Sequence, residues 1–142
     1  MTDPVKLEII SIPPGVILYD SLIPAGFPSP AEGMEGQPID LNDYCVRNPS
    51  STFFAKAKGK SMEAIGIFEN SLLVVDRSVK PTPNSTCILF YNGEFTVKKV
   101  RRMGDKVILK SLSYIRHPDI EIENPEDLVI WGVVIKIISD PQ

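Results

Sequence analysis

The sequence predicts a mostly β domain of folded antiparallel sheets, preceded by an extended N-terminal arm. Three observations indicate this fold. From Thr52 onward, short apolar and β-branched runs alternate with turn residues. Two of these runs are separated by Asn92-Gly93, a strong two-residue hairpin signal. Upstream, seven of the 13 prolines fall between Met1 and Pro38, where they exclude a long helix or a central strand.

We place the arm at residues 1–38 and the β-rich, peptidase-like domain at residues 39–142. The arm carries too many aliphatic side chains to be a fully solvated tail, so we expect it to lie along the globular part or along a partner. Within it, Ala25-Gly26 combines small side chains with flanking prolines that favour extended backbone. An extended peptidase substrate needs such small groups at its scissile bond. Local sequence alone, however, favours a simple glycine-containing loop.

A short helix is predicted over residues 40–48, because Asp40 can cap its start and Asn48-Pro49 ends it. Strands are predicted over residues 52–57, 71–76, 86–91, 94–103, 106–112 and 128–138. Gly104-Asp105 provides a second turn. These short strands and turns indicate a compact domain of folded sheets or a partial barrel.

The composition is that of an ordinary soluble protein, 43% hydrophobic and 23% charged, with a net charge of −3. Because this small net charge is negative, the sequence gives no indication of a basic surface, and direct nucleic-acid binding is not expected. No segment is long and apolar enough to span a membrane, and no signal-peptide pattern is found. Cys45 and Cys87 lack metal-ligand spacing and fit the free thiols of a cytoplasmic protein. We therefore expect a cytoplasmic protein without metal or cofactor.

Two stretches could supply catalytic chemistry. Ser61 follows Gly59-Lys60 in a turn after a strand, and Lys98 and Lys99 lie in a strand with mostly apolar or β-branched neighbours. A lysine that is buried and neutral can act as the base for a serine nucleophile. Taken alone, the serine is also typical of a turn or helix cap, and the lysines of a solvated edge strand. Strand alternation does not decide which lysine faces inward.

Other catalytic arrangements are disfavoured. His117 is the only histidine and lies in a polar loop, which argues against a Ser-His-Asp triad and against a His-based zinc site. Neither a phosphate-binding loop nor a dinucleotide-binding glycine pattern occurs. The carboxylates between Asp119 and Asp127 have the strand-and-loop spacing of a solvated rim. Among the arrangements considered, a Ser-Lys pair is the remaining simple combination of nucleophile and base.

Several motifs resemble the LexA/UmuD family of self-cleaving serine peptidases, and the similarity covers most of the chain. They are Gly59-Lys60-Ser61-Met62, Leu72–Asp76, Gly93-Glu94-Phe95-Thr96-Val97-Lys98-Lys99, and the stretches at residues 25–30, 39–42 and 131–135. The resemblance implies a LexA-like peptidase domain.

The resemblance also assigns roles to individual residues. It implies that Ser61 is the nucleophile and Lys98 its general base. It implies cleavage between Ala25 and Gly26, and an oxyanion hole formed by the backbone N–H groups of Lys60 and Ser61. In the family, an aspartate stands at the position that Lys60 occupies in this chain. Lys60 therefore departs from the family pattern and adds a positive charge beside the Ser61-Lys98 pair.

A second departure concerns Asn70, which stands where the family has a glycine. Asparagine also adopts the left-handed conformation that such a turn requires, so we expect the turn to be retained.

By resemblance, the protein is a homodimer that removes its own arm on RecA–single-stranded DNA filaments during the SOS response to DNA damage. The trimmed form would then act as accessory subunit of a UmuC-like, error-prone translesion DNA polymerase. Three alternatives remain. The first is the peptidase domain of a LexA- or phage-type repressor, for which the residues before Gly26 are too few to hold a DNA-binding domain. The others are a signal peptidase, which needs a membrane anchor, and a catalytically silent interaction module of the same fold.

Overall fold

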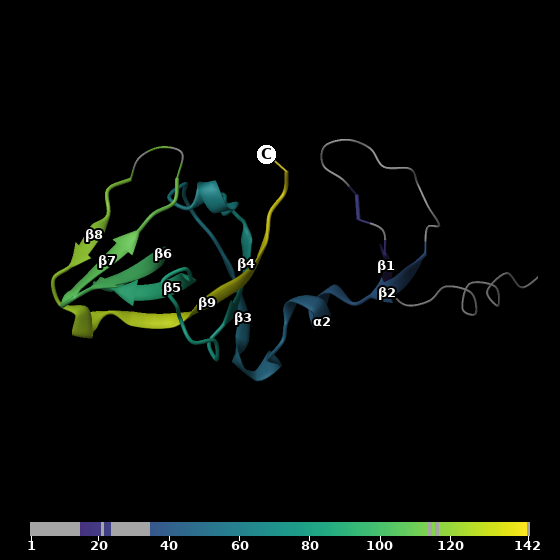
Figure 1. Ribbon diagram of the computed structural model, residues 1–142, viewed down its shortest axis with the longest axis horizontal. Coiled ribbons are helices and arrows are strands. Elements are labelled where there is room, and N and C mark those ends of the chain that lie inside the picture. The colour runs from purple at the N-terminus through teal and green to yellow at the C-terminus, as the bar shows by residue number, and fades with distance from the viewer. Residues whose placement is uncertain (1–14, 21, 24–34, 114, 116, 142) are drawn as a thin grey trace, which may run out of the picture. The chain divides into compact units, whose positions relative to one another are not determined.

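The computed structural model describes residues 15–20, 22–23, 35–113, 115 and 117–141 (Figure 1). The chain divides into two compact units, with the division between Tyr44 and Cys45. The bond predicted to be cleaved, Ala25-Gly26, lies outside the described residues.

The first unit contains a two-stranded antiparallel sheet. Strand β1 (Val16–Tyr19) pairs with β2 (Gly36–Ile39), so that Val16 lies opposite Ile39 and Tyr19 opposite Gly36. The sequence predicts an extended backbone here but not this pairing. Gly36 permits it, because a Cβ atom at that position would lie 2.5 Å from the Leu18 carbonyl oxygen.

Helix α2 (Leu41–Cys45) begins where the sequence predicts but is a single turn long. The Asp40 Oδ1 atom accepts hydrogen bonds from the N–H groups of Asn42 and Asp43, at 3.0 and 3.4 Å. The predicted extension to residue 48 is wrong, because the chain leaves the helix after Cys45 and Pro49 starts a separate 3-10 turn, η1 (Pro49–Ser51).

The second unit is built on one seven-stranded antiparallel sheet with the order β3-β4-β9-β5-β6-β7-β8. Its strands are β3 (Thr52–Lys56), β4 (Leu72–Asp76), β5 (Thr86–Tyr91), β6 (Glu94–Met103), β7 (Lys106–Lys110), β8 (Ile120–Ile122) and β9 (Val129–Ile138). Two further 3-10 turns are η2 (Glu63–Ile65) and η3 (Pro125–Asp127). The mostly β fold predicted from the sequence is confirmed. No helix among the described residues is long and apolar enough to cross a membrane.

The turns follow the predicted chemistry. Asn92 and Gly93 have φ angles of 52° and 76°, the pair of positive values that a type I′ hairpin requires. They join β5 to β6 in a continuous ladder from Thr86↔Lys99 to Tyr91↔Glu94. Asn70 has φ 68° and takes the left-handed conformation expected of it.

The core consists of two clusters, and β5 contributes to both. Ile88 packs in the first cluster with Met62, Leu73 and their neighbours, whereas Cys87 and Leu89 pack in the second. Successive strand residues point to opposite faces, so both faces of β5 are covered. Figure 1 shows β9 running from β5 to β4 and thereby joining the two parts of the sheet.

A buried carboxylate fastens the start of the second unit to the sheet. Asp76, at the end of β4, is fully buried and accepts hydrogen bonds from Asn48 Nδ2 at 2.9 Å and Ser51 Oγ at 2.8 Å. The Ser78 N–H and hydroxyl groups donate to it as well, at 2.8 and 2.7 Å. These donors, that of Asn48 foremost, hold the pKa of Asp76 well below its usual range.

Candidate active site

The serine and the lysine singled out from the sequence lie together. Lys98 Nζ donates a hydrogen bond to Ser61 Oγ at 2.7 Å, although the two residues are 37 positions apart. Ser61 is half-buried, and Lys98 is only 8% exposed. This is the distance at which a nucleophile can pass its proton to a base.

The register of β6 determines which lysine reaches the serine. Lys98 lies opposite the buried Cys87 of β5, whereas Lys99 lies opposite Thr86 on one side and Lys110 on the other. Because side chains alternate along a strand, the two lysines point to opposite faces of the sheet. Lys98 is therefore the lysine directed at Ser61.

Burial changes the protonation of this lysine. Desolvation lowers the pKa of Lys98, because burial costs the ammonium form far more hydration free energy than it costs the neutral amine. Lys60, by contrast, is exposed, so solvent screens its charge. A larger fraction of Lys98 is consequently neutral near physiological pH than of a lysine in water.

The turn that carries Ser61 is held by hydrogen bonds to backbone and side-chain acceptors. Gly59 has φ 88°, a value that favours glycine, and its N–H donates to Glu69 Oε2 at 2.7 Å. Beyond β7, the Leu112 N–H donates to the Ser61 carbonyl oxygen at 2.8 Å, and the Ala64 N–H donates to the Leu112 carbonyl oxygen at 2.9 Å. The predicted strand over residues 106–112 thus ends early, because Leu112 pairs with the serine turn and not with β6.

Met62 holds the turn that carries Ser61 against the core. Its side chain is 2% exposed within the first core cluster, and its Sδ atom accepts a hydrogen bond from the Leu112 N–H at 3.3 Å. Within the described part of the chain, nothing accepts a hydrogen bond from the N–H groups of Lys60 or Ser61. The structure thus leaves both donors without an acceptor in this part of the chain.

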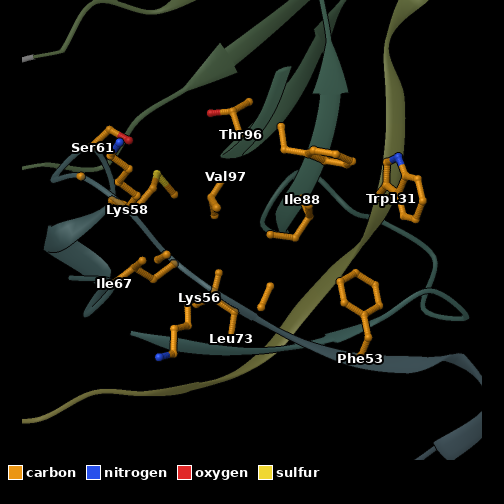
Figure 2. A pocket seen from close by; sticks show the side chains of 15 residues that line it. Phe53, Lys56, Lys58, Ser61, Ile67, Leu73, Ile88, Thr96, Val97 and Trp131 are labelled. Atoms are coloured by element: carbon orange, nitrogen blue, oxygen red, sulfur yellow. The ribbon is translucent and has the colours of Figure 1, made fainter. Parts of the chain in front are cut away.

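A cavity of about 410 Å³ opens beside the serine (Figure 2). In this view Ser61 and Lys58 lie at one side, and Phe53 and Trp131 lie at the other. Its remaining lining residues are Ala55, Lys56, Ala57, Gly59, Met62, Ile67, Leu73, Ile88, Phe95, Thr96 and Val97. This mostly apolar lining includes two lysines and no carboxylate. Such a cavity suits an extended peptide with apolar side chains.

Trp131 forms part of an aromatic wall. The centre of its ring lies 5.5 Å from the centre of the Phe95 ring, in an edge-to-face arrangement. The centre of the Phe95 ring lies 4.8 Å from the centre of the Phe90 ring. The sequence interpretation quoted Trp131 only for its resemblance and did not assign it to a site. The available signal was Gly132, since a glycine inside a strand often marks a close approach of another segment.

Other sequence expectations concern His117 and metal binding. His117 is exposed, and its Nδ1 atom lies 3.0 Å from the Ile115 carbonyl oxygen. In the ranges that the structure describes, no group of three or more His, Cys, Asp or Glu residues could hold a metal ion. Cys45 and Cys87 are free and buried.

The Ser61-Lys98 pair, the free N–H donors and the apolar cavity together provide what nucleophilic cleavage of an amide needs.

Comparison with known proteins places this geometry in context. The model of the Peptidase S24-like family matches residues 17–135. Protein SamA of Salmonella typhimurium is 39% identical over 121 residues, which cover 85% of this chain and 83% of SamA. Protein MucA of Escherichia coli is 40% identical over 116 residues, which cover 82% of this chain and 79% of MucA.

Two further relatives differ in how similar they are to this chain and in how much of their own length is matched. The LexA repressor of Thiobacillus denitrificans is 28% identical over 96 residues, which cover 68% of this chain and 48% of the repressor. Protein ImpA of Shigella flexneri, by comparison, is 40% identical over 85% of this chain and 81% of its own length.

Proposed function

The chain belongs to the Peptidase S24-like family, and on that basis we propose that it is a UmuD-type serine peptidase that cleaves its own N-terminal arm. Family membership supports the peptidase activity. The observation that carries the catalytic assignment is the 2.7 Å contact between Lys98 Nζ and Ser61 Oγ. Desolvation, which lowers the pKa of Lys98, supports its role as the base.

The first half of the reaction transfers an acyl group to the serine. Neutral Lys98 accepts the Ser61 proton while Oγ attacks the carbonyl carbon of Ala25. The N–H groups of Lys60 and Ser61 stabilise the resulting oxyanion. The bond between Ala25 and Gly26 then breaks, and the Lys98 ammonium donates its proton to the leaving nitrogen of Gly26.

The second half releases the serine. Lys98, neutral again, accepts a proton from a water molecule that attacks the ester carbonyl carbon formed by Ala25 and Ser61. The ester bond breaks, and the Lys98 ammonium returns its proton to Ser61 Oγ. Ala25 leaves as a carboxylic acid, which ionises to the carboxylate by releasing its proton to the solvent. No metal or cofactor is required for either half.

The proposed biological role rests on the similarity to the UmuD-type relatives. We propose that a cytoplasmic homodimer cleaves itself on RecA–single-stranded DNA filaments in the SOS response. The trimmed form would then assist a UmuC-like, error-prone translesion DNA polymerase. Similarity to SamA, ImpA and MucA over most of their lengths supports this role.

Two alternatives are weaker. A repressor peptidase is less well supported, because the LexA repressor is 28% identical over 68% of this chain whereas SamA is 39% identical over 85%. A catalytically silent interaction module has no need of a lysine desolvated against a serine, and a cleavage assay separates it from the proposed peptidase.

The test is intact mass spectrometry of the purified protein with and without RecA–single-stranded DNA filaments. We expect the filaments to produce a fragment that begins at Gly26 and contains the last 117 of the 142 residues. The Ser61→Ala variant should remain whole. A different new N-terminus would overturn the site assignment, and an uncleaved chain under every inducing condition would overturn the peptidase.

A further inference from the structure

Glu69 fastens the segment that comes just before the proposed nucleophile. Its Oε2 atom accepts a hydrogen bond from the Gly59 N–H group at 2.7 Å. This short distance is typical of a bond to an ionised acceptor, which is stronger than a bond between neutral groups. Glu69 is exposed and takes no direct part in the reaction described above.

The loop between η2 and β4 explains why a side chain, and not the backbone, makes this contact. Beyond the last residue pair of β3 and β4, Ala57 donates to the Ser71 carbonyl oxygen and accepts from the Asn70 N–H group, both at 2.9 Å. Asn70 turns the chain here with a φ of 68°. The Gly59 N–H group, two residues after Ala57, donates to the Glu69 carboxylate instead.

The loop that carries Glu69 is itself fixed to the end of β9. Ser71, only 2% exposed, accepts a hydrogen bond from the Phe68 N–H group at 2.7 Å through its Oγ atom. The same hydroxyl is hydrogen-bonded to that of Ser139 at 2.5 Å, and Ser139 donates to the Gly66 carbonyl oxygen at 2.9 Å. Residues on both sides of Glu69 are thus held, which fixes the position of its backbone.

The segment from Gly59 to Ser61 is anchored at its two ends. Glu69 holds the Gly59 N–H group, and the Leu112 N–H group holds the Ser61 carbonyl oxygen at 2.8 Å. Between these anchors lie the N–H groups of Lys60 and Ser61, which are the proposed oxyanion donors. Such donors stabilise a transition state most when they are already fixed before it forms.

We propose that Glu69 is a positioning residue of the active site, whose hydrogen bond to the Gly59 N–H group fixes the two donors of the proposed oxyanion hole. This inference rests on the proposed self-cleavage and adds a residue that acts on it through the backbone of the serine turn. A misplacement of about 1 Å can slow a reaction by about a hundredfold. Because Glu69 is exposed, its substitution should change the stability of the fold little.

The first measurement is unassisted self-cleavage of the full chain from about pH 6 to 10. Glu69→Ala removes the acceptor, and we expect it to slow cleavage by about ten- to a hundredfold. The factor should be the same at every pH, because the base Lys98 is untouched. Glu69→Gln keeps an oxygen acceptor of the same reach and should cleave at close to the parent rate. Glu123→Ala is the matched control, because Glu123 is also an exposed glutamate but follows β8.

The second measurement separates the oxyanion donors from the binding of the arm. A small alkyl fluorophosphonate reacts with an activated serine and loses fluoride, and its phosphoryl oxygen occupies the place of the oxyanion. This reagent does not need the arm. Labelling of Ser61, measured by intact mass, should slow in Glu69→Ala and recover in Glu69→Gln, while circular dichroism verifies the fold of each variant.

Cleavage of Glu69→Ala at the parent rate would overturn the positioning role and leave the proposed peptidase intact. Slower cleavage with unchanged labelling would overturn it too, because Glu69 would then act on the arm. An equal loss in Glu69→Gln would show that the charge matters and not the acceptor, and a profile displaced along the pH axis would show an effect on Lys98; either result also overturns the role. A parent protein that neither cleaves under any inducing condition nor reacts with the fluorophosphonate would overturn the peptidase, and the role of Glu69 with it.

Discussion

Lys98 of β6 lies directly opposite Cys87 of β5, and the two side chains are 8% and 1% exposed. This pairing places the lysine against a buried partner in the central part of the sheet. The Asn92-Gly93 turn fixes the pairing, since a hairpin of two residues allows little slippage. A shift by one residue would place Lys99 at the serine.

Lys98→Ala should abolish self-cleavage, with a loss of about a thousandfold or more, as for other members of a nucleophile–base unit. Lys99→Ala is the matched control, because Lys99 has the same charge and is the next residue along the strand, but it points to the other face. It should cleave at nearly the parent rate. Intact mass after incubation with RecA filaments measures both variants, and circular dichroism verifies their folds. Activity in Lys98→Ala with loss in Lys99→Ala would reverse the assignment.

Much of the sheet was predictable because local signals agree with long-range pairing. The sequence predicts β5 and β6 with the bounds that the structure has, since Asn92-Gly93 separates two clear apolar runs. Strand β8 (Ile120–Ile122) was missed, because three residues between acidic neighbours carry almost no periodic signal. The pairing of β1 with β2 was missed because Gly36 and Pro38 resemble loop residues.

The site was predictable only in part. Periodicity left Lys98 and Lys99 equivalent, and only the family resemblance selected Lys98. In the structure, the hydrogen bond from Lys98 Nζ to Ser61 Oγ distinguishes them. The wall at Trp131 depends on β9, which pairs with both β4 and β5 through irregular registers, at Val74/Val75 and Ile88/Leu89. These irregularities interrupt the alternation along β9 that a sequence interpretation needs.

Asp76→Asn should destabilise the fold by about 2 kcal/mol, because four donors lose a charged acceptor in a buried position. The pKa of Asp76 is depressed in the folded state, so its contribution to stability is complete above the unfolded value, about pH 4. It is lost as pH falls below that value toward the folded pKa. Urea unfolding of the parent and of Asp76→Asn between about pH 2 and 7 measures the free energy of unfolding that depends on this carboxylate.

The expected result for Asp76 is a free-energy difference between the parent and Asp76→Asn that is constant at neutral pH and shrinks in acid. The exposed Asp105, changed to Asn, serves as the control and should show little effect at any pH. A constant difference throughout the acid range would mean that the ionised carboxylate is not what stabilises this corner of the sheet.

Gly132→Ala should destabilise the fold by about 1–3 kcal/mol, because its Cβ atom would overlap Val75 Cγ1 at 2.6 Å. It should also displace Arg77 from Trp131. Thermal unfolding measures the first effect, and tryptophan emission at a temperature where the fold persists measures the second. Gly66→Ala is a control for space, since nothing lies within 4 Å of a Cβ atom there, although its φ of 91° imposes strain of its own. An unchanged emission spectrum for Gly132→Ala would contradict the expected displacement of Arg77, whose Cζ atom lies 4.6 Å from the centre of the Trp131 ring.

The rate of unassisted cleavage should rise with pH, because only the neutral form of Lys98 can accept the Ser61 proton. Burial lowers the pKa of Lys98, so the rise should begin below the range of a free lysine, about pH 10.4, and level off above the folded pKa. If the pKa stays above neutrality, the protein cleaves slowly at pH 7 and completes the reaction at alkaline pH without an activator. RecA filaments would then act by favouring the docked state of the arm and would add no catalytic group. The intact fraction over time, from about pH 6 to 10, measures this, with Ser61→Ala inert throughout. A rate that falls as pH rises, while the fold persists, would exclude Lys98 as the general base.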